Sequence, residues 1–205
     1  MPRTGLTPEE LYNKALDSTE TEIRKNGVER LKLTDIARDL KVSHAALYKF
    51  FSDKQSLLDE VSKRWLDRID RELERISAKE EPVDGILREW FLKLHSMKRE
   101  KILVDPRLFT AFNLSAEKTR PFVVSHLSTM SRLLEDLISK GMKSGMFHCS
   151  SPKEGARILF EGTAAFHHPR LVLESIEEER TPLLEALLET LLSGLKTKSP
   201  EVSKK

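Results

Sequence analysis

Hydrophobic residues recur along this chain at intervals of three and four, the spacing of helices with one apolar face, and no segment alternates as a strand would. Proline, glycine and capping residues divide the pattern; Thr7 and Pro8 begin the first helix, and Gly27 ends it. We predict helices over 8–25, from near 34, from 43, from 54 to the break at 77–82, and over 83–97, 105–115, 119–144, 152–174 and 181–196. The predicted fold class is all-α.

Residues 33–58 place two short helices around a tight turn, the pattern of a helix-turn-helix. Thr34 is expected to cap the first helix, whose apolar positions share one face. Lys41 and Val42 form the predicted turn, and Ser43 is expected to cap the second helix. The buried side of that second helix is predicted to consist of Ala46, Leu47, Phe50 and Phe51.

The opposite face of the second short helix is polar or small, which suits a groove of duplex DNA. Lys49 can contact phosphate or guanine, and His44 can bond a base edge or a phosphate. Ala45 lets the backbone approach a thymine methyl group, and Tyr48 lies on the same outward face. These four residues are the predicted contact surface.

A third helix start follows directly, at Ser52 or Asp53. The free amides of its first turn can bind a phosphate, and Lys54 lies beside them. Bulk charge adds little to this picture, because the net charge of the 205 residues is only +2. Residues 41–54 nevertheless carry Lys41, Lys49 and Lys54 against Asp53 alone, so positive charge gathers where DNA contact is expected.

The motif resembles the TetR family of bacterial transcriptional regulators. The residues that carry the resemblance are Thr34, Ile36, Ala37, Val42, Ser43, Leu47, Tyr48, Phe51, Lys54 and Leu57. The resemblance implies that Thr34, Ser43, Tyr48 and Lys54 contact phosphates. It also implies that His44, Ala45, Ala46 and Lys49 lie closest to base edges. His44 and Phe50 differ from the residues common in the family at these positions, so the operator sequence is not carried over.

The resemblance also implies the organisation of the whole chain. An N-terminal three-helix DNA-binding domain is expected over residues 1–53, followed by a larger helical domain for effector binding and dimerisation over 54–196. Residues 197–205 are rich in lysine and have nothing to bury, so we predict a disordered tail. The composition, 39% hydrophobic and 33% charged, suits such a helical protein.

Aromatic, apolar and histidine side chains of the second domain recur at spacings that could line a ligand pocket or form a core. The pocket hypothesis names Trp90, Leu94, Phe109, Phe112, Phe122, His126, Phe160, Thr163 and His167. Most of these are equally well explained as core residues. His126, Thr163 and His167 are the polar members that can orient a small-molecule effector.

The leucines of the helix predicted over 181–196 form an apolar face wider than a contact with one core would cover. Small residues in the preceding helix permit another helix to approach closely. The surface predicted to form a homodimer contains Ala156, Gly162, Leu184, Leu187, Leu188, Leu191 and Leu195. A single subunit that buries the whole helix is the alternative. A dimer would present two DNA-binding heads to a palindromic operator.

Other chemistry has weaker support. Two pairs of neighbouring residues could supply metal ligands, His148 with Cys149 and His167 with His168. However, adjacent histidines on a helix point about 100° apart, and the sequence has no metal-binding motif. We therefore predict no metal and no cofactor. No nucleotide-binding or hydrolase motif occurs, so an enzyme is disfavoured.

The absence of apolar segments of signal-peptide or membrane-spanning length, and the single cysteine, favour a cytoplasmic protein without a membrane partner. The sequence therefore predicts a DNA-binding transcriptional regulator, most simply a repressor that a small molecule releases. A helical protein-interaction module or an enzyme without operator binding is the alternative.

Overall fold

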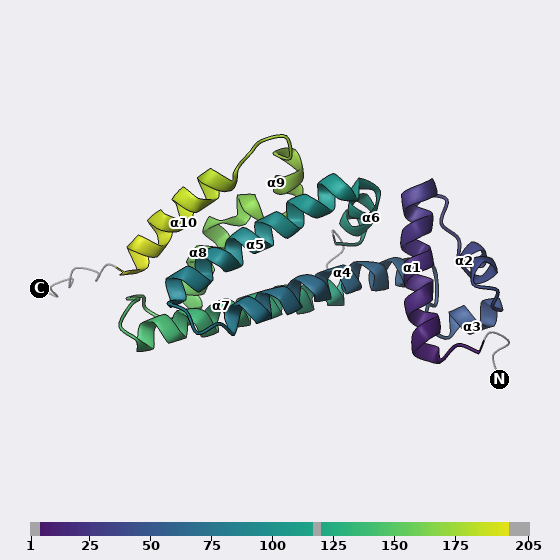
Figure 1. The fold of residues 1–205 in the computed structure, drawn as a ribbon, viewed down its shortest axis with the longest axis horizontal. Helices are drawn as coiled ribbons and strands as arrows, with labels where there is room; N and C mark the ends of the chain where they lie inside the picture. The colour runs from purple at the N-terminus through teal and green to yellow at the C-terminus, as the bar shows by residue number, and fades with distance from the viewer. Residues whose placement is uncertain (1–4, 117–119, 197–205) are drawn as a thin grey trace, which may run out of the picture. The chain divides into compact units, whose positions relative to one another are not determined.

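The computed structural model describes residues 5–116 and 120–196, and all regular structure within these ranges is helical (Figure 1). The elements are α1 (Pro8–Asn26), α2 (Leu33–Asp39), α3 (His44–Tyr48), α4 (Lys54–Ser77), α5 (Val83–Val104), α6 (Pro106–Ala116), α7 (Pro121–Lys143), α8 (Pro152–Gly162), the 3-10 turn η1 (Ala164–Phe166), α9 (Pro169–Glu174) and α10 (Thr181–Lys196). The predicted all-α class is confirmed. The predicted tail at 197–205 lies outside the described residues.

Two predicted helix boundaries were wrong. The charged run after Met97 does not end α5, which continues to Val104 and stops before Pro106. The helix predicted over 152–174 is instead divided into α8, η1 and α9. Proline explains the second break, because the residue before a proline avoids helical backbone angles, and His168 before Pro169 is extended (φ −68°, ψ 124°).

The described chain forms two compact units. Residues up to 67 and residues 104–124 form the first unit, and residues 68–103 with those from 125 onward form the second. Helix α4 contributes residues to both units. The predicted boundary after residue 53 therefore separates the helix-turn-helix from parts of α4 and α6 that share its compact unit.

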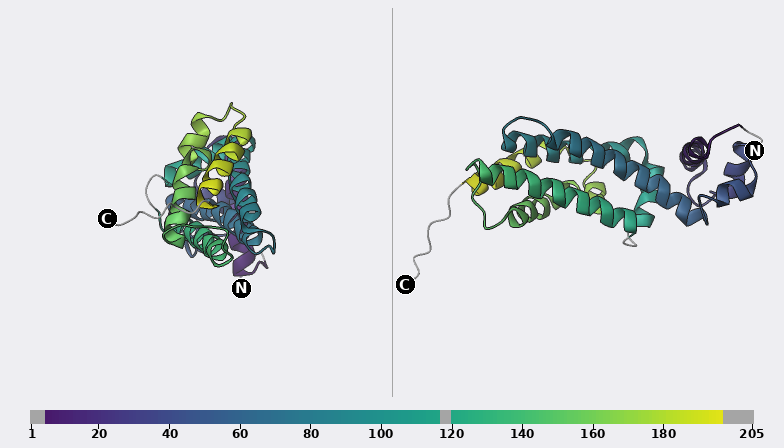
Figure 2. Two further views of the ribbon diagram at one scale, coloured as in Figure 1. Left: turned by 90° about the vertical axis from the view of Figure 1, so that its left-hand side faces the viewer. Right: turned by 90° about the horizontal axis from the view of Figure 1, so that it is seen from below.

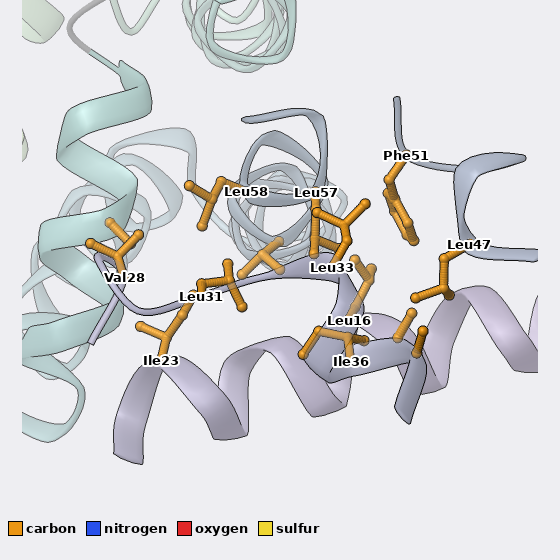
Figure 3. Packing of buried hydrophobic residues seen from close by; sticks show 14 of the residues in the cluster. Leu16, Ile23, Val28, Leu31, Leu33, Ile36, Leu47, Phe51, Leu57 and Leu58 are labelled. Carbon is orange, nitrogen blue, oxygen red and sulfur yellow. The ribbon is translucent and has the colours of Figure 1, made fainter. Parts of the chain in front are cut away.

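The first unit is built around one hydrophobic cluster. Leu16 and Ile23 of α1, Ile36 of α2, Leu47 of α3 and Leu57 of α4 all contribute to it (Figure 3). Each of these side chains is at most 1% exposed. Such burial is the main favourable term in folding a small helical domain.

Polar contacts tie α1 to the later helices of this unit. The side chain of Arg64 on α4 donates to Asp17 and Glu20, at 2.8 and 2.5 Å. Arg24 pairs at 2.8 Å with Asp105, which directly precedes α6 and is buried. Arg107 donates to the last carbonyl oxygens of α1, those of residues 24 and 25, at 2.7 and 2.6 Å. These carbonyls lack helical partners, so Arg107 satisfies the end of α1.

In the second unit, α5, α7 and the later part of α4 run side by side (Figures 1 and 2). Its core includes Ile69, Leu73, Trp90, Leu94, Leu134, Ile138, Leu159, Leu184, Leu188 and Leu192. Helices α8 and α10 contact each other. The backbone amide of His148 donates to the carbonyl oxygen of Leu195 at 2.7 Å, which joins the segment after α7 to the end of α10.

A close contact between Gly141 and Phe147 closes the end of α7. A Cβ atom added at Gly141 would lie 2.1 Å from Cδ2 of Phe147, whose ring is 2% exposed. We therefore expect Gly141→Ala to lower the free energy of unfolding by about 1–3 kcal/mol, because the buried ring must move. Gly85→Ala is the matched control, since nothing lies within 4 Å of its added Cβ. Urea unfolding measures both variants, and equal stability of the two would contradict the predicted clash.

Candidate DNA-binding interface

The turn between α2 and α3 has the backbone geometry of a tight reversal. Lys41 has a positive φ of 56°, in the left-handed region that residues with side chains seldom adopt. The amide of Val42 donates to the carbonyl oxygen of Ala37 at 3.0 Å and closes the turn. The prediction of a turn at these two residues is confirmed.

Thr34 does not cap α2 as predicted. The helix begins at Leu33, and Lys32 occupies the N-cap position without a side-chain hydrogen bond. The amide of Asp35 already donates to the carbonyl oxygen of Lys32 at 3.0 Å. Helical bonding therefore starts before Thr34, which lies partly exposed in the first turn.

The short helix α3 is fixed by a cap at its start and by hydrophobic anchors at its end. The hydroxyl of Ser43 accepts a hydrogen bond from the amide of Ala46 at 3.3 Å, as predicted. Leu47 and Phe51 are 1% and 0% exposed, whereas Ala46 and Phe50 are partly buried. The ring of Phe51 also stacks on Tyr12 of α1, with centroids 5.5 Å apart.

This anchoring leaves the opposite face of α3 open to solvent. His44, Ala45, Tyr48 and Lys49 are all exposed, and Tyr48 is 52% exposed although it is a large aromatic residue. The predicted division of α3 into a buried and an outward face is thus confirmed. The outward residues combine a cation, an imidazole, a phenol and a small side chain, which can donate to phosphates and approach base edges.

Helix α4 begins beside this face with a reciprocal cap. The amide of Asp53 donates to the hydroxyl of Ser56 at 3.1 Å, and the amide of Ser56 donates to the Asp53 carboxylate at 2.7 Å. These bonds lower the pKa of Asp53 and identify it, rather than Ser52, as the helix start. The ammonium of Lys54 donates to the carbonyl oxygen of Glu29 at 3.1 Å, which holds it next to the first turn.

The residues of the pocket hypothesis are divided between the two compact units. Phe109, Phe112 and Phe122 belong to the first unit, where the Phe112 ring contacts Trp65 edge-on at 4.6 Å. The other six belong to the second: Trp90, Leu94, His126, Phe160, Thr163 and His167. Of these, the structure brings Phe160 and His167 together, with rings stacked at 4.3 Å and a 2.9 Å bond from His167 Nε2 to the Phe160 carbonyl oxygen.

Two charged residues of the second unit, Lys98 and Asp70, were not predicted to be buried together with His126 or in contact with it. Lys98 is only 3% exposed, and burial lowers the pKa of its ammonium to about 8. Asp70 of α4 contacts Nδ1 of His126 at 2.5 Å and interacts electrostatically with Lys98. The available signal was that Lys98 lies one turn after Leu94, on the apolar face of α5. The charged run around it favoured an exposed segment instead.

A surface hollow of about 450 Å³ lies elsewhere in the second unit, between the end of α4 and α7. Its lining is mostly charged or polar and includes Glu74, Arg132, Asp136 and Lys140. The residues of the pocket hypothesis do not line it.

The expected dimer surface is partly occupied by the subunit's own core. Ala156, Leu184, Leu188 and Leu195 are buried within the single subunit, and so are core residues in this structure. Leu187 and Leu191 are partly exposed, Gly162 is exposed, and Leu191 lies 3.2 Å from the Cβ position of Gly162. Leu183 and Ile158, at 55% and 41% exposed, add apolar surface on α10 and α8.

The described residues hold no cluster of three or more histidine, cysteine, aspartate or glutamate side chains that is arranged to bind a metal ion. Over the same residues, no helix has the length and apolar character needed to cross a membrane.

The fold and this interface define a helix-turn-helix protein with a second helical unit after the DNA-binding head. Residues 15–61 match the family model of bacterial regulatory proteins of the tetR family, and residues 85–188 match the model of a tetracyclin repressor-like C-terminal domain. The chain therefore belongs to the TetR family of transcriptional regulators, whose members are DNA-binding proteins. A search of curated proteins gave no match.

Solved structures share the fold along nearly the whole chain. SmeT, the repressor of the Stenotrophomonas maltophilia multidrug efflux pump SmeDEF, has a TM-score of 0.67 at 20% identity, covering 98% of this chain and 96% of its own. FadR from Bacillus subtilis, in complex with stearoyl-CoA, has a TM-score of 0.64 at 17% identity, covering 89% and 98%. A Rhodococcus sp. RHA1 protein of unknown function has a TM-score of 0.65 at 24% identity, covering 91% and 96%.

The buried imidazole of His167 makes stability depend on pH. Burial lowers the pKa of His167 to about 4 from 6.5, so the folded state binds fewer protons than the unfolded state between these values. The contribution of the neutral His167 imidazole to the free energy of unfolding is therefore fully present above pH 6.5 and is lost as the pH falls towards 4. Between pH 7 and pH 5 the loss from this residue is about 2 kcal/mol.

Replacement of His167 isolates this contribution. We expect His167→Gln to unfold in urea with a smaller difference between pH 7 and pH 5 than the wild-type protein. The neighbouring His168 is exposed, so His168→Gln is the matched control and keeps the full difference. An unchanged pH dependence in His167→Gln would show that this imidazole is not buried in its neutral form.

Proposed function

We propose that the protein is a sequence-specific repressor that binds a palindromic DNA operator as a homodimer and is released by a small-molecule effector. The observation that carries this proposal is the exposed face of α3, on which Tyr48 is solvent-accessible beside His44 and Lys49. A large aromatic side chain held outward by a buried opposite face is suited to contact with a partner.

In the proposed complex, α3 enters the major groove. His44, Ala45, Ala46 and Lys49 lie nearest the base edges, where Lys49 can donate to guanine and the small alanines permit close approach. Ser43 at the start of α3 and Tyr48 on its face contact the phosphate backbone.

Two further residues position the head on the backbone. Thr34 lies in the first turn of α2 and is partly exposed, so its hydroxyl can donate to a phosphate. Lys54 lies at the start of α4, where its ammonium can bind another phosphate. One of the three ammonium donors is used by Glu29, which leaves two for DNA.

A dimer supplies the second head. Leu183, Leu187 and Leu191 on α10, with Gly162 and Ile158 on α8, are the apolar residues left for a partner once the subunit core is complete. Two copies joined there would present two α3 helices to successive major grooves, about 34 Å apart along the DNA. The symmetry of the dimer then requires an inverted repeat in the operator.

The proposed effector acts in the second unit. Two structural neighbours support regulation of this kind: FadR is solved with stearoyl-CoA, and SmeT represses an efflux pump. Helix α4 passes from the head unit into the second unit without a break, so a change around its later residues can favour a head position that no longer fits both grooves.

Selection of binding sites from a randomised duplex pool tests the DNA function directly. We expect an inverted repeat to be enriched, and the double variant Tyr48→Ala, Lys49→Ala to bind the selected duplex at least about tenfold more weakly, because contacts on one face of α3 are lost. Gel-shift titrations at fixed salt measure the affinities.

The matched control is Lys14→Ala, which removes one exposed positive charge from α1 without touching α3. Its affinity should stay within about threefold of wild type, the effect of general charge loss alone. Absence of any enriched sequence, with weak binding that the double variant retains, would contradict the proposal and favour an interaction module or an enzyme.

A further inference from the structure

The side chain of Tyr12 on α1 contacts both aromatic residues that follow α3. Its ring stacks on Phe51, with centroids 5.5 Å apart and planes inclined by 20°, and it meets Phe50 edge-on, with centroids 5.9 Å apart. Aromatic pairs in these arrangements are favourable beyond the area that they bury. Tyr12 therefore supports the end of α3 from its buried side.

The hydroxyl of Tyr12 extends this contact to α4. It donates a hydrogen bond to Glu60 Oε2 at 2.5 Å, and both side chains are partly buried. Burial and the bonded carboxylate raise the pKa of the Tyr12 phenol, so the hydroxyl keeps the proton that it donates. Hydrogen bonds to a carboxylate are stronger than those between neutral groups. The bond therefore holds the ring against α4 as well as against the end of α3.

The two phenylalanines are joined to the outward face of α3 through the backbone. The amides of Phe50 and Phe51 both donate to the carbonyl oxygen of Leu47, at 2.9 and 3.0 Å. The exposed residues Tyr48 and Lys49 lie within the turn that these bonds close. A displacement of either ring therefore moves the backbone that carries Tyr48 and Lys49.

The position of this turn matters because α3 has only five residues. A helix of this length is not stable alone, so its place depends on the packing behind it. Hydrogen bonds to base edges require donor–acceptor distances of about 2.7–3.2 Å, whereas the attraction between a cation and phosphates acts over about 10 Å. A small displacement of α3 therefore weakens base recognition more than it weakens general attraction to DNA.

Neither the helix-turn-helix motif nor the family model includes the Tyr12 contact. Tyr12 lies before residues 15–61, the segment that matches the model of tetR-family regulatory proteins. Its contacts to Phe51 and Glu60 are nevertheless within one compact unit, because all three residues belong to the first 67. The contact is thus a feature of this chain's own head.

We propose that Tyr12 is a positioning residue for base recognition: held by Glu60, its ring keeps the turn that carries Lys49 at the place that base contacts require. This inference rests on the proposed function, in which α3 enters the major groove. Tyr12 does not itself contact DNA in this arrangement. Its effect is therefore on the preference for the operator and not on attraction to DNA in general.

The affinity ratio between the selected operator and a shuffled duplex of equal length and composition tests this role. Fluorescence anisotropy measures both affinities of the full-length protein at fixed salt, at a temperature where circular dichroism shows wild-type helix content. We expect Tyr12→Phe and Glu60→Ala each to lower the ratio about fivefold, because each removes the same hydrogen bond. The affinity for the shuffled duplex should change less than about twofold. An unchanged ratio in both variants would overturn the proposal.

A double variant shows whether the two side chains act as one unit. Tyr12→Phe combined with Glu60→Ala should have the same ratio as either single variant, because no second bond remains to be lost. Glu60→Gln keeps an oxygen acceptor and should retain the wild-type ratio within about twofold. Lys14→Ala, on the same helix as Tyr12, should lower both affinities alike. Additive losses in the double variant, or a loss in Glu60→Gln as large as in Glu60→Ala, would overturn the role of this bond.

Hydrogen exchange in the free protein separates this inference from the proposed function. In Tyr12→Phe, NMR should show the amides of Phe50 and Phe51 exchanging about fivefold faster than in wild type. The amide of Leu40, bonded to the Ile36 carbonyl oxygen at 3.0 Å, should keep its rate.

The two kinds of measurement fail in different ways. A selected operator with an unchanged affinity ratio would overturn the role of Tyr12 and leave the DNA function intact. Faster exchange at Phe50 and Phe51 in a protein that selects no operator would uphold the positioning of α3 by Tyr12 and overturn the DNA function. Unchanged exchange without a selected operator would overturn both.

Discussion

Burial of Leu47 and Phe51 is the interaction on which the DNA-binding interface depends. These two side chains anchor a helix of only five residues, too short to be stable alone, to a cluster formed by α1, α2 and α4 (Figure 3). Because residues on one helix side are fixed inward, His44, Ala45, Tyr48 and Lys49 must face outward. The chemistry of the interface is thus set by hydrophobic packing behind it.

Helix α4 contributes to the core of the head and also to the second unit. Its first turns complete the head core through Leu57, and Arg64 joins it to α1 by two ion pairs. Its later turns contribute Asp70 to the polar group in the other unit. One helix thus contributes residues to both compact units. Helix α6 shares the head unit as well, through the Arg24 to Asp105 ion pair and the contacts of Arg107.

The sequence predicted best what local interactions decide. The Ser43 cap, the turn at Lys41 and Val42 and the two faces of α3 depend on residues only a few positions apart, and all were predicted. The N-terminus of α2 was misplaced because Thr34 is a favourable cap by type, while the backbone starts the helix earlier. The single helix predicted over 152–174 was too long, because the periodic apolar pattern continues past Gly162, where α8 ends.

Long-range packing accounts for the remaining differences. The residues next to Leu184 and Leu188 in the sequence do not indicate whether the leucines of α10 pack against their own subunit or against a partner. In the structure both leucines are buried in the core of the single subunit. Lys98 lies in a charged run, Lys98-Arg99-Glu100-Lys101, which is typical of an exposed segment. Its burial depends on where α4 and α7 lie in space, which periodicity along α5 does not encode.

Chemical footprinting on the selected duplex tests the central claim most directly. Dimethyl sulfate modifies guanine N7 in the major groove, where α3 is proposed to lie. The account predicts two protected groups of guanines, related by the symmetry of the operator and separated by about one helical turn, and loss of both in the Tyr48→Ala, Lys49→Ala variant. Protection confined to one site, or unchanged in the variant, would contradict recognition by a pair of α3 helices.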